Sequence, residues 1–320
     1  MGERNVSKTR RTVVREEVRR HPVVEDFKST MKLFVHNHLA FGGFLIVMAY
    51  FAIAILDAAY PQWLGIKNIS SMLNFLPSGQ YSLVLPTPPT NLHGWWYWFG
   101  TTAAQIPLLP SILAAFKIDM SYSVLIVLVG MAVGIVLGTI SGYFGGLTDE
   151  LLMRVTDIFL SLPSIVLAIA VVFVLGESLQ NVVIALMIIW WPIYARLTRG
   201  VTLSVKNMKY IEAAVASGSS KFRNIFVHVI PNVLSPAFVQ VSLDLGSVML
   251  IFAGLDFIGF NKGSPYAPEL GNLINIGQQY LLSGIWWPVL FPGMFILIFT
   301  VAANIMGDGM RDVLDPKLRR

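Results

Sequence analysis

Few side chains in this sequence have the spacing of a catalytic, phosphate-binding or metal-binding motif. Gly218-Ser219-Ser220-Lys221 comes nearest to a phosphate-binding loop, but it lacks the upstream glycine and the preceding strand that let backbone amides surround a phosphate. Two of the five histidines, His36 and His38, are close in sequence, yet residues two apart point in different directions on a helix. The chain has no cysteine, which excludes a disulfide, a thiol nucleophile and a zinc–thiolate site. We therefore predict no catalytic residue, no metal ligand and no directly bound cofactor.

The composition of the chain identifies an integral membrane protein. Its 320 residues are 55% hydrophobic and 13% charged, with a mean hydropathy of +0.66, which is too apolar for an ordinary soluble domain. A helix needs about 18 or more apolar residues to cross the hydrocarbon layer. Six apolar stretches are long enough: Leu39 to Leu56, Met120 to Gly146, Ile158 to Gly176, Ser178 to Ala195, Val233 to Ile258 and Ile285 to Met306. All are uncharged except the fifth, which Asp244 and Asp256 interrupt. We predict an all-α membrane protein with six transmembrane helices.

Some polar residues and prolines fall inside these stretches. Asp244 lies near the middle of the fifth, where a charge is costly and should face a bundle interior or a water-filled path. It either lines a translocation pathway or is a structural carboxyl bonded to a neighbouring helix or a partner subunit. Pro163 and Pro192 should kink the third and fourth helices and are further pathway candidates. Asp256 is expected at the outer membrane interface.

Arg154 and Asp157 lie just before the third apolar stretch. Because residues three apart are neighbours on a helix surface, we expect these two to form an ion pair at the inner interface.

The segment from Tyr210 to Asn232 is a polar interruption with an ordered pattern, YIEAAVASGSSKFRNIFVHVIPN. A short helix with small side chains, Ile211 to Ala216, is followed by Gly218, where a helix C-cap or sharp turn is expected. A second amphipathic piece, Lys221 to Ile230, is expected to end at Pro231. We interpret the segment as the place where another protein acts on this chain.

Basic residues set the orientation in the membrane. With a cytoplasmic N-terminus, all but three of the 23 Lys and Arg residues lie on the inner side, as the positive-inside rule requires. The divisions that follow are an N-terminal tail (1–37), a first transmembrane helix (38–58), an extracellular loop (59–119), a core transmembrane domain (120–310) containing a cytoplasmic loop (203–232), and a cytoplasmic C-terminal tail (311–320). The Trp- and Pro-rich extracellular loop is either an interfacial aromatic belt or a docking or gating surface for an extracellular partner.

The polar interruption resembles the cytoplasmic coupling loop, or EAA loop, of importer permeases in the ATP-binding cassette (ABC) family. That pattern reads E-A-A, three residues, G, nine residues, then I-x-L-P. It is matched here by Glu212, Ala213, Ala214, Gly218, Ile230 and Pro231, with Ile230 in place of Leu and His228 in place of Ile.

Other segments extend the resemblance to the second permease of dipeptide and oligopeptide importers. They run from Gly142 to Gly176, from Trp191 to Gly200 and from Gly307 to Pro316. The chain departs from that branch at Gly100-Thr101-Thr102, where the branch carries a G-T-D-x-x-G-R-D type sequence. It departs again at Asp244 and Asp256, where small or hydroxylated residues are expected.

The resemblance implies a type I ABC importer permease fold. It implies that the chain and a second permease subunit enclose a pathway for oligopeptides or oligosaccharides. Two cytoplasmic ATP-binding subunits would bind ATP and Mg²⁺ and hydrolyse the ATP, while an extracellular solute-binding protein would deliver the substrate. The six matched positions of the loop would contact the ATP-binding subunits. Membrane lipid, and no nucleic acid, completes the set of expected partners.

One alternative remains open from the sequence. An ion-coupled secondary transporter or a channel would work without ATP, with Asp244 as its coupling carboxylate. That interpretation leaves the small-residue cytoplasmic loop unexplained.

Overall fold

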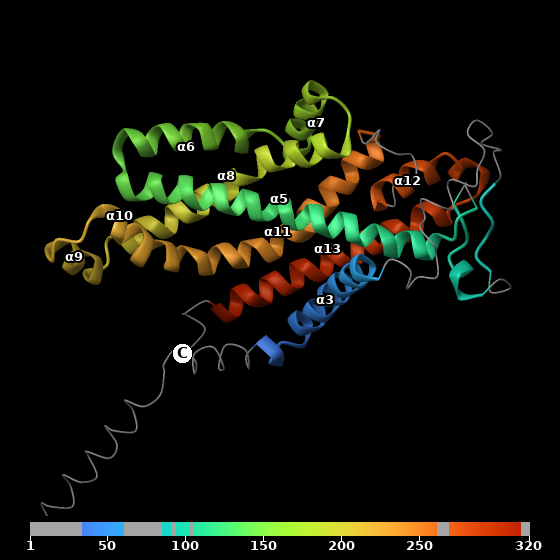
Figure 1. Cartoon of the computed structure of the whole chain (residues 1–320), viewed down its shortest axis with the longest axis horizontal. Helices are drawn as coiled ribbons and strands as arrows, with labels where there is room; N and C mark the ends of the chain where they lie inside the picture. Colours follow the sequence, from blue (N-terminus) through green and yellow to red (C-terminus); the bar gives the residue numbers. More distant parts are fainter. Residues whose placement is uncertain (1–33, 61–84, 91–93, 103–104, 261–268, 315–320) are drawn as a thin grey trace, which may run out of the picture.

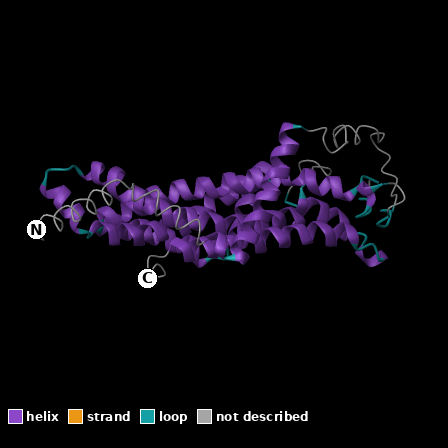
Figure 2. Cartoon of the chain, turned by 90° about the horizontal axis from the view of Figure 1, so that it is seen from below, coloured by secondary structure: helices purple, strands orange, loops and turns teal. Residues whose placement is uncertain are grey.

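A computed structural model describes residues 34–60, 85–90, 94–102, 105–260 and 269–314. The described residues form helices joined by turns, with one isolated bridge between Thr101 and Pro107, and the long helices run lengthwise through the molecule (Figures 1 and 2). The elements are α3 (His38–Ala59), η1 (Trp95–Tyr97), α5 (Leu108–Phe144), α6 (Gly146–Ser161), α7 (Ser164–Leu175), α8 (Leu179–Lys206), α9 (Lys209–Ala216), α10 (Lys221–Asn224), the π-helical η2 (Ile225–Val229), α11 (Ile230–Ile258), α12 (Leu270–Gln278), η3 (Leu281–Ser283) and α13 (Trp287–Leu314).

Helix α5 is longer than the apolar stretch that predicts it. It begins at Leu108 rather than Met120, so residues 108–119, expected in the extracellular loop, are helical. The prediction ended the loop too late because Lys117 and Asp119 interrupt the uncharged run. In the fold Asp119 is buried. Pro110 is compatible with this early start, since the first turn of a helix needs no backbone N–H.

The third predicted span is not one kinked helix. It is divided into α6 and α7, whose axes differ by 94°. Pro163 does not lie inside a helix as expected but caps the start of α7, and Leu162 before it is extended. Proline disfavours helical geometry in the preceding residue, so the chain breaks here instead of bending. Among the described residues five helices are long and apolar enough to cross a membrane, and the α6–α7 pair makes six if it counts as one span.

Helices α5 and α8 lie side by side at close range. An added Cβ at Gly134 or Gly138 would collide with Tyr194 or Thr198 of α8. The Thr198 hydroxyl donates a hydrogen bond to the carbonyl of Gly134 at 3.0 Å. Glycines spaced four apart thus let the two backbones approach, as is common between membrane helices.

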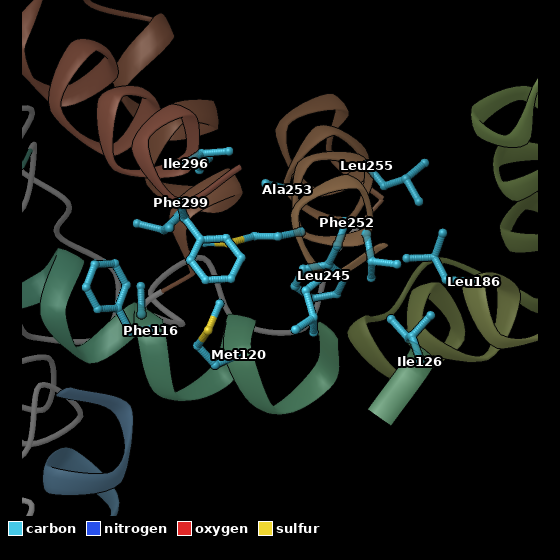
Figure 3. Packing of buried hydrophobic residues seen from close by; sticks show 14 of the residues in the cluster. Phe116, Met120, Ile126, Leu186, Leu245, Phe252, Ala253, Leu255, Ile296 and Phe299 are labelled. Carbon is cyan, nitrogen blue, oxygen red and sulfur yellow. The ribbon is translucent and has the colours of Figure 1, made fainter. Parts of the chain in front are cut away.

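The main apolar core lies where α5 meets α11 and α13. Met120 of α5 and Phe299 of α13 point toward one another, with Phe116 beside them and Phe252 on α11 (Figure 3). Tyr50 of α3 stacks on Phe116 with ring centroids 4.3 Å apart. The first span is thereby joined to the bundle.

The start of α3 and the end of α13 lie at the same end of the bundle. Gly309 there lacks room for a Cβ because Ala40 lies against it. The α9 and α10 helices lie at this end too, whereas η1 and α12 lie at the opposite end (Figure 1).

Candidate functional site

The candidate site is the α9–α10 loop, residues 209–229, which projects from one end of the bundle (Figure 1). Helix α9 ends in a Schellman motif: the N–H of Gly218 donates to the carbonyl of Val215 at 2.9 Å, and the N–H of Ser219 donates to the carbonyl of Ala214 at 3.0 Å. Gly218 has φ of +85°, a left-handed conformation that glycine adopts without steric cost. The predicted C-cap at Gly218 is confirmed.

The second half of the loop continues into a membrane helix. Ser220 caps α10 by accepting a hydrogen bond from the N–H of Arg223. A π-helical turn, η2, follows and leads directly into α11, with Pro231 in the first turn of that helix. The expectation that Pro231 ends the amphipathic piece is therefore wrong. The wider π turn accommodates a residue that lacks a backbone N–H, so the helix passes through it.

The predicted coupling residues lie together on the loop and at its junction with α11. Glu212, Ala213, Gly218 and Pro231 are exposed, whereas Ala214 and Ile230 are half-buried.

Large apolar side chains extend this exposed surface. Val215, Phe222, Phe226 and Val227 are each between 54% and 69% exposed. They lie beside the basic residues Lys221 and Arg223, which are also exposed. Exposed apolar side chains bordered by polar ones are typical of surfaces that contact a protein or a membrane.

The opposite face of the loop is anchored in a small second core. Ile211, Ile225 and Val229 are buried there, together with residues of α5, α8 and α11: Ile135, Tyr143, Val205, Val233 and Ala237. The loop is thus seated on three membrane helices.

Asp244 lies in the middle of α11, the helix that follows the loop, and is buried within the bundle, 4% exposed. Its Oδ1 accepts a hydrogen bond from Gln240 Nε2 at 2.9 Å. Tyr194 and Trp190 of α8 approach the same carboxylate without forming a hydrogen bond of normal geometry. Within this chain, the Asp244 carboxylate is thus bonded to Gln240 of its own helix and lies beside α8.

The two candidate pathway prolines are in different surroundings. Pro192 lies inside α8, as predicted, and is buried there, whereas Pro163 is exposed at the α6–α7 break.

The ion pairs around α6 differ from the expected Arg154–Asp157 pair. Arg154 contacts Glu150 at 3.6 Å, and Asp157 instead pairs with Arg196 of α8. The i,i+4 neighbour and a residue from another helix therefore replace the expected i,i+3 partner.

Arg199 forms the more buried contact between α8 and α6. Its Nε and Nη2 donate to the two carboxylate oxygens of Asp149 at 2.6 and 2.7 Å, and Ser141 of α5 donates to the same carboxylate. Two-point pairing of this kind fixes geometry as well as charge. It ties the ends of α5, α6 and α8 together, and nothing in the spacing of these residues predicts it.

Asp256 is not at an interface as expected but is buried, 2% exposed. Asp119 and Glu269, which are also buried, lie close enough to interact with it electrostatically. Asp119 accepts a hydrogen bond from the N–H of Leu270 at 3.1 Å. Among the described residues no group of three or more His, Cys, Asp or Glu side chains is arranged to hold a metal ion.

Comparison with known proteins gives one consistent family. Residues 134–320 match the family described as "Binding-protein-dependent transport system inner membrane component". The chain is 35% identical to the di/tripeptide transport system permease protein DppC of Pseudomonas aeruginosa (strain UCBPP-PA14), over 91% of this chain and 92% of that protein.

Two further relatives cover much of the chain. The probable D,D-dipeptide transport system permease protein DdpC of Escherichia coli (strain K12) is 40% identical over 72% of this chain and 75% of its own length. The glutathione transport system permease protein GsiD of Pectobacterium atrosepticum is 31% identical over 93% of this chain and 95% of its own length.

Proposed function

The chain belongs to the family of binding-protein-dependent transport system inner membrane components, and we propose that it imports short peptides as half of a two-subunit pathway. It is a multi-pass membrane permease subunit of the ABC importer type. Peptides are the proposed substrate class because the similar permeases named above carry dipeptides, di- or tripeptides and glutathione. A solute-binding protein on the outer side would deliver them.

We propose that the α9–α10 loop is where ATP hydrolysis is coupled to transport. The observation that carries this proposal is the loop's two-sided construction: exposed apolar and basic residues on one face, and a buried anchor on three membrane helices on the other. The sequence has no phosphate-binding loop of its own, so the energy would come from two ATP-binding subunits. The segment from Glu212 to Gly218 would lie in a groove on one of them.

The inward side of the loop follows from its position. The loop, the start of α3 and the end of α13 share one end of the bundle (Figure 1), and the basic residues concentrate in the loop and the tails. We infer from the positive-inside rule that this end is cytoplasmic, together with both termini.

We propose that the α6–α7 break faces the pathway. Helix α6 has 16 residues, so at about 1.5 Å per residue the break lies about 24 Å from its start, a distance shorter than the roughly 30 Å hydrocarbon layer. Residues 161–163 are exposed there, and the nearby Asp157–Arg196 pair has side chains more than half exposed. Irregular backbone and charges are not tolerated against lipid at this depth, so this face meets water or the second permease.

Asp244 fits the role of a structural carboxyl better than that of a residue lining the pathway. Because its carboxylate is enclosed between α11 and α8 and bonded to Gln240, we infer that it is a structural carboxyl rather than an ion-coupling group.

Purification of the intact complex tests the proposed function. The chain is expected to co-purify with a second permease and two ATP-binding subunits, and the reconstituted complex should accumulate a labelled dipeptide only with the solute-binding protein and ATP. Uptake of a labelled oligosaccharide but not of dipeptides would overturn the substrate. Uptake by this chain alone, driven by an ion gradient, would overturn the ABC mechanism.

A further inference from the structure

We propose that Asn224 is a positioning residue that locks the α9–α10 loop to the end of α5, so that a displacement of the loop moves α5 and α8 with it. The inference rests on the proposed function, because it concerns how force applied at the loop reaches the membrane helices. In this proposal Asn224, Tyr143 and Lys206 transmit movement of the loop to the membrane helices.

Asn224 is the last residue of α10, and its side chain has no exposed surface. Its Oδ1 accepts a hydrogen bond from the Ser219 hydroxyl at 2.6 Å, directly after the Gly218 turn. Its Nδ2 donates to the hydroxyl of Tyr143, near the end of α5, at 3.4 Å. One amide therefore joins the turn of the loop, the α10 helix and α5.

Tyr143 is held from a second direction by α8. The Lys206 ammonium donates to the carbonyl of Tyr143 at 2.6 Å and lies 5.6 Å from the centre of its ring. This contact supplies a donor to a helix C-terminal carbonyl, where a cation is favourable. The ends of α5, α8 and α10 thus meet at a single tyrosine.

The surroundings of this junction are apolar. Tyr143 packs in the small core with Ile211, Ile225 and Val229. Apolar contacts are non-directional and tolerate sliding, whereas a buried amide must keep its hydrogen bonds because leaving it unpaired is costly. The Asn224 bonds therefore define one position of the loop relative to α5, while the exposed face of the loop stays free for a partner.

The test measures the amount of dipeptide transported per ATP hydrolysed by the reconstituted complex. Asn224→Ala is expected to lower this ratio about fivefold or more, the range of a typical coupling free energy, while the ATP-binding subunits still co-purify. Asn207→Ala is the matched control, because Asn207 is an exposed asparagine nearby that bonds only the Leu203 carbonyl in its own helix. Its ratio is expected to stay at the wild-type value.

Tyr143→Phe gives a second route to the same bond, since it removes only the hydroxyl. It should lower the ratio in the same direction, and the double variant should be no worse than Asn224→Ala, because both changes remove one contact. An unchanged ratio in Tyr143→Phe overturns the proposal even if Asn224→Ala fails to fold, and so do effects that multiply in the double variant.

Loss of the ATP-binding subunits from Asn224→Ala would assign the residue to docking and also overturn the proposal. If wild-type complexes never contain ATP-binding subunits, it is the proposed function that fails.

Discussion

Gly218 shows how one residue sets the geometry of the α9–α10 loop. An added Cβ would meet no atom within 4 Å, yet φ is +85°. The demand for glycine is therefore conformational, and crowding has no part in it. Because the Schellman motif depends on this left-handed residue, the orientation of Glu212 to Ala216 relative to α10 depends on it as well.

Two substitutions at Gly218 separate conformation from contact. Asparagine enters the left-handed region more readily than other L-residues, so Gly218→Asn is expected to keep most dipeptide uptake. Gly218→Val, which is β-branched, is expected to leave the protein in the membrane but abolish ATP-dependent uptake. Uptake assays with membrane-level quantification check both. Equal, normal uptake in the two variants would contradict the role of the turn.

Asp244 is a residue whose role follows from its neighbours. Gln240 donates to its Oδ1, and Asp244→Asn keeps a carbonyl oxygen there, so uptake and thermal stability are expected to stay near wild type. Asp244→Ala leaves the half-buried amide of Gln240 without its acceptor and should cost about 1 kcal/mol of stability. Thermal unfolding in detergent measures the difference. Loss of transport in a stable Asp244→Asn protein would favour ion coupling instead.

Among the elements, α5 and α8 are closely packed along several helical turns. The glycines of α5 bring the two backbones together, and Thr198 of α8 donates a hydrogen bond to the Gly134 carbonyl of α5. The Arg199 bonds to Asp149 add α6 to this pair. The loop that follows α8 is therefore attached to a closely packed helix pair. By contrast, the α6–α7 break interrupts the hydrogen bonding of the neighbouring layer.

Close packing of α5 on α8 is tested by adding one methyl group. Gly138→Ala drives a Cβ against the Thr198 side chain and the Ala195 carbonyl and is expected to destabilise the protein by about 1–3 kcal/mol, as overpacking does. Gly200→Ala is the matched control on α8, since nothing lies within 4 Å of its Cβ position. It should be neutral or slightly stabilising. Similar melting temperatures for both variants would show that the contact is loose.

Across the whole molecule, the exposed faces differ in polarity. The outer surface of α13 carries exposed apolar residues such as Leu297, which suits lipid. The α6–α7 break combines exposed backbone with an exposed ion pair, which suits water. A pathway shared with a second permease would account for this asymmetry.

The difference between these two faces can be measured with single introduced cysteines, because the sequence contains no other cysteine that would react. Leu162→Cys, at the break, is expected to react with a small membrane-impermeant thiol reagent in the assembled complex, at a rate that changes when ATP and the solute-binding protein are added. Leu297→Cys is the control, because its side chain is comparably exposed on α13 and is expected to face lipid. Equal reactivity at the two positions would place the break outside the pathway.

Local features of this protein are determined by the sequence itself. Long uninterrupted apolar stretches predict membrane helices, because a helix satisfies its own backbone hydrogen bonds within the bilayer. The pattern Glu212-Ala213-Ala214, Gly218, Ile230-Pro231 resembles the coupling loop of importer permeases, and it predicts the turn at Gly218 that the structure shows. The apolar stretches and the turn depend on residues that are close together in the sequence. They can therefore be predicted without knowledge of the fold.

Only the tertiary structure decides which distant residues meet. It pairs Asp157 with Arg196 instead of Arg154 and buries Asp256 beside Glu269. It extends α5 back to Leu108 and gives the buried Asp119 a hydrogen bond from the N–H of Leu270 in α12. It also places the buried Asn224 side chain of α10 between Ser219, beside the Gly218 turn, and Tyr143 of α5. Each depends on which helix faces lie together, and that choice is made by packing across the whole bundle.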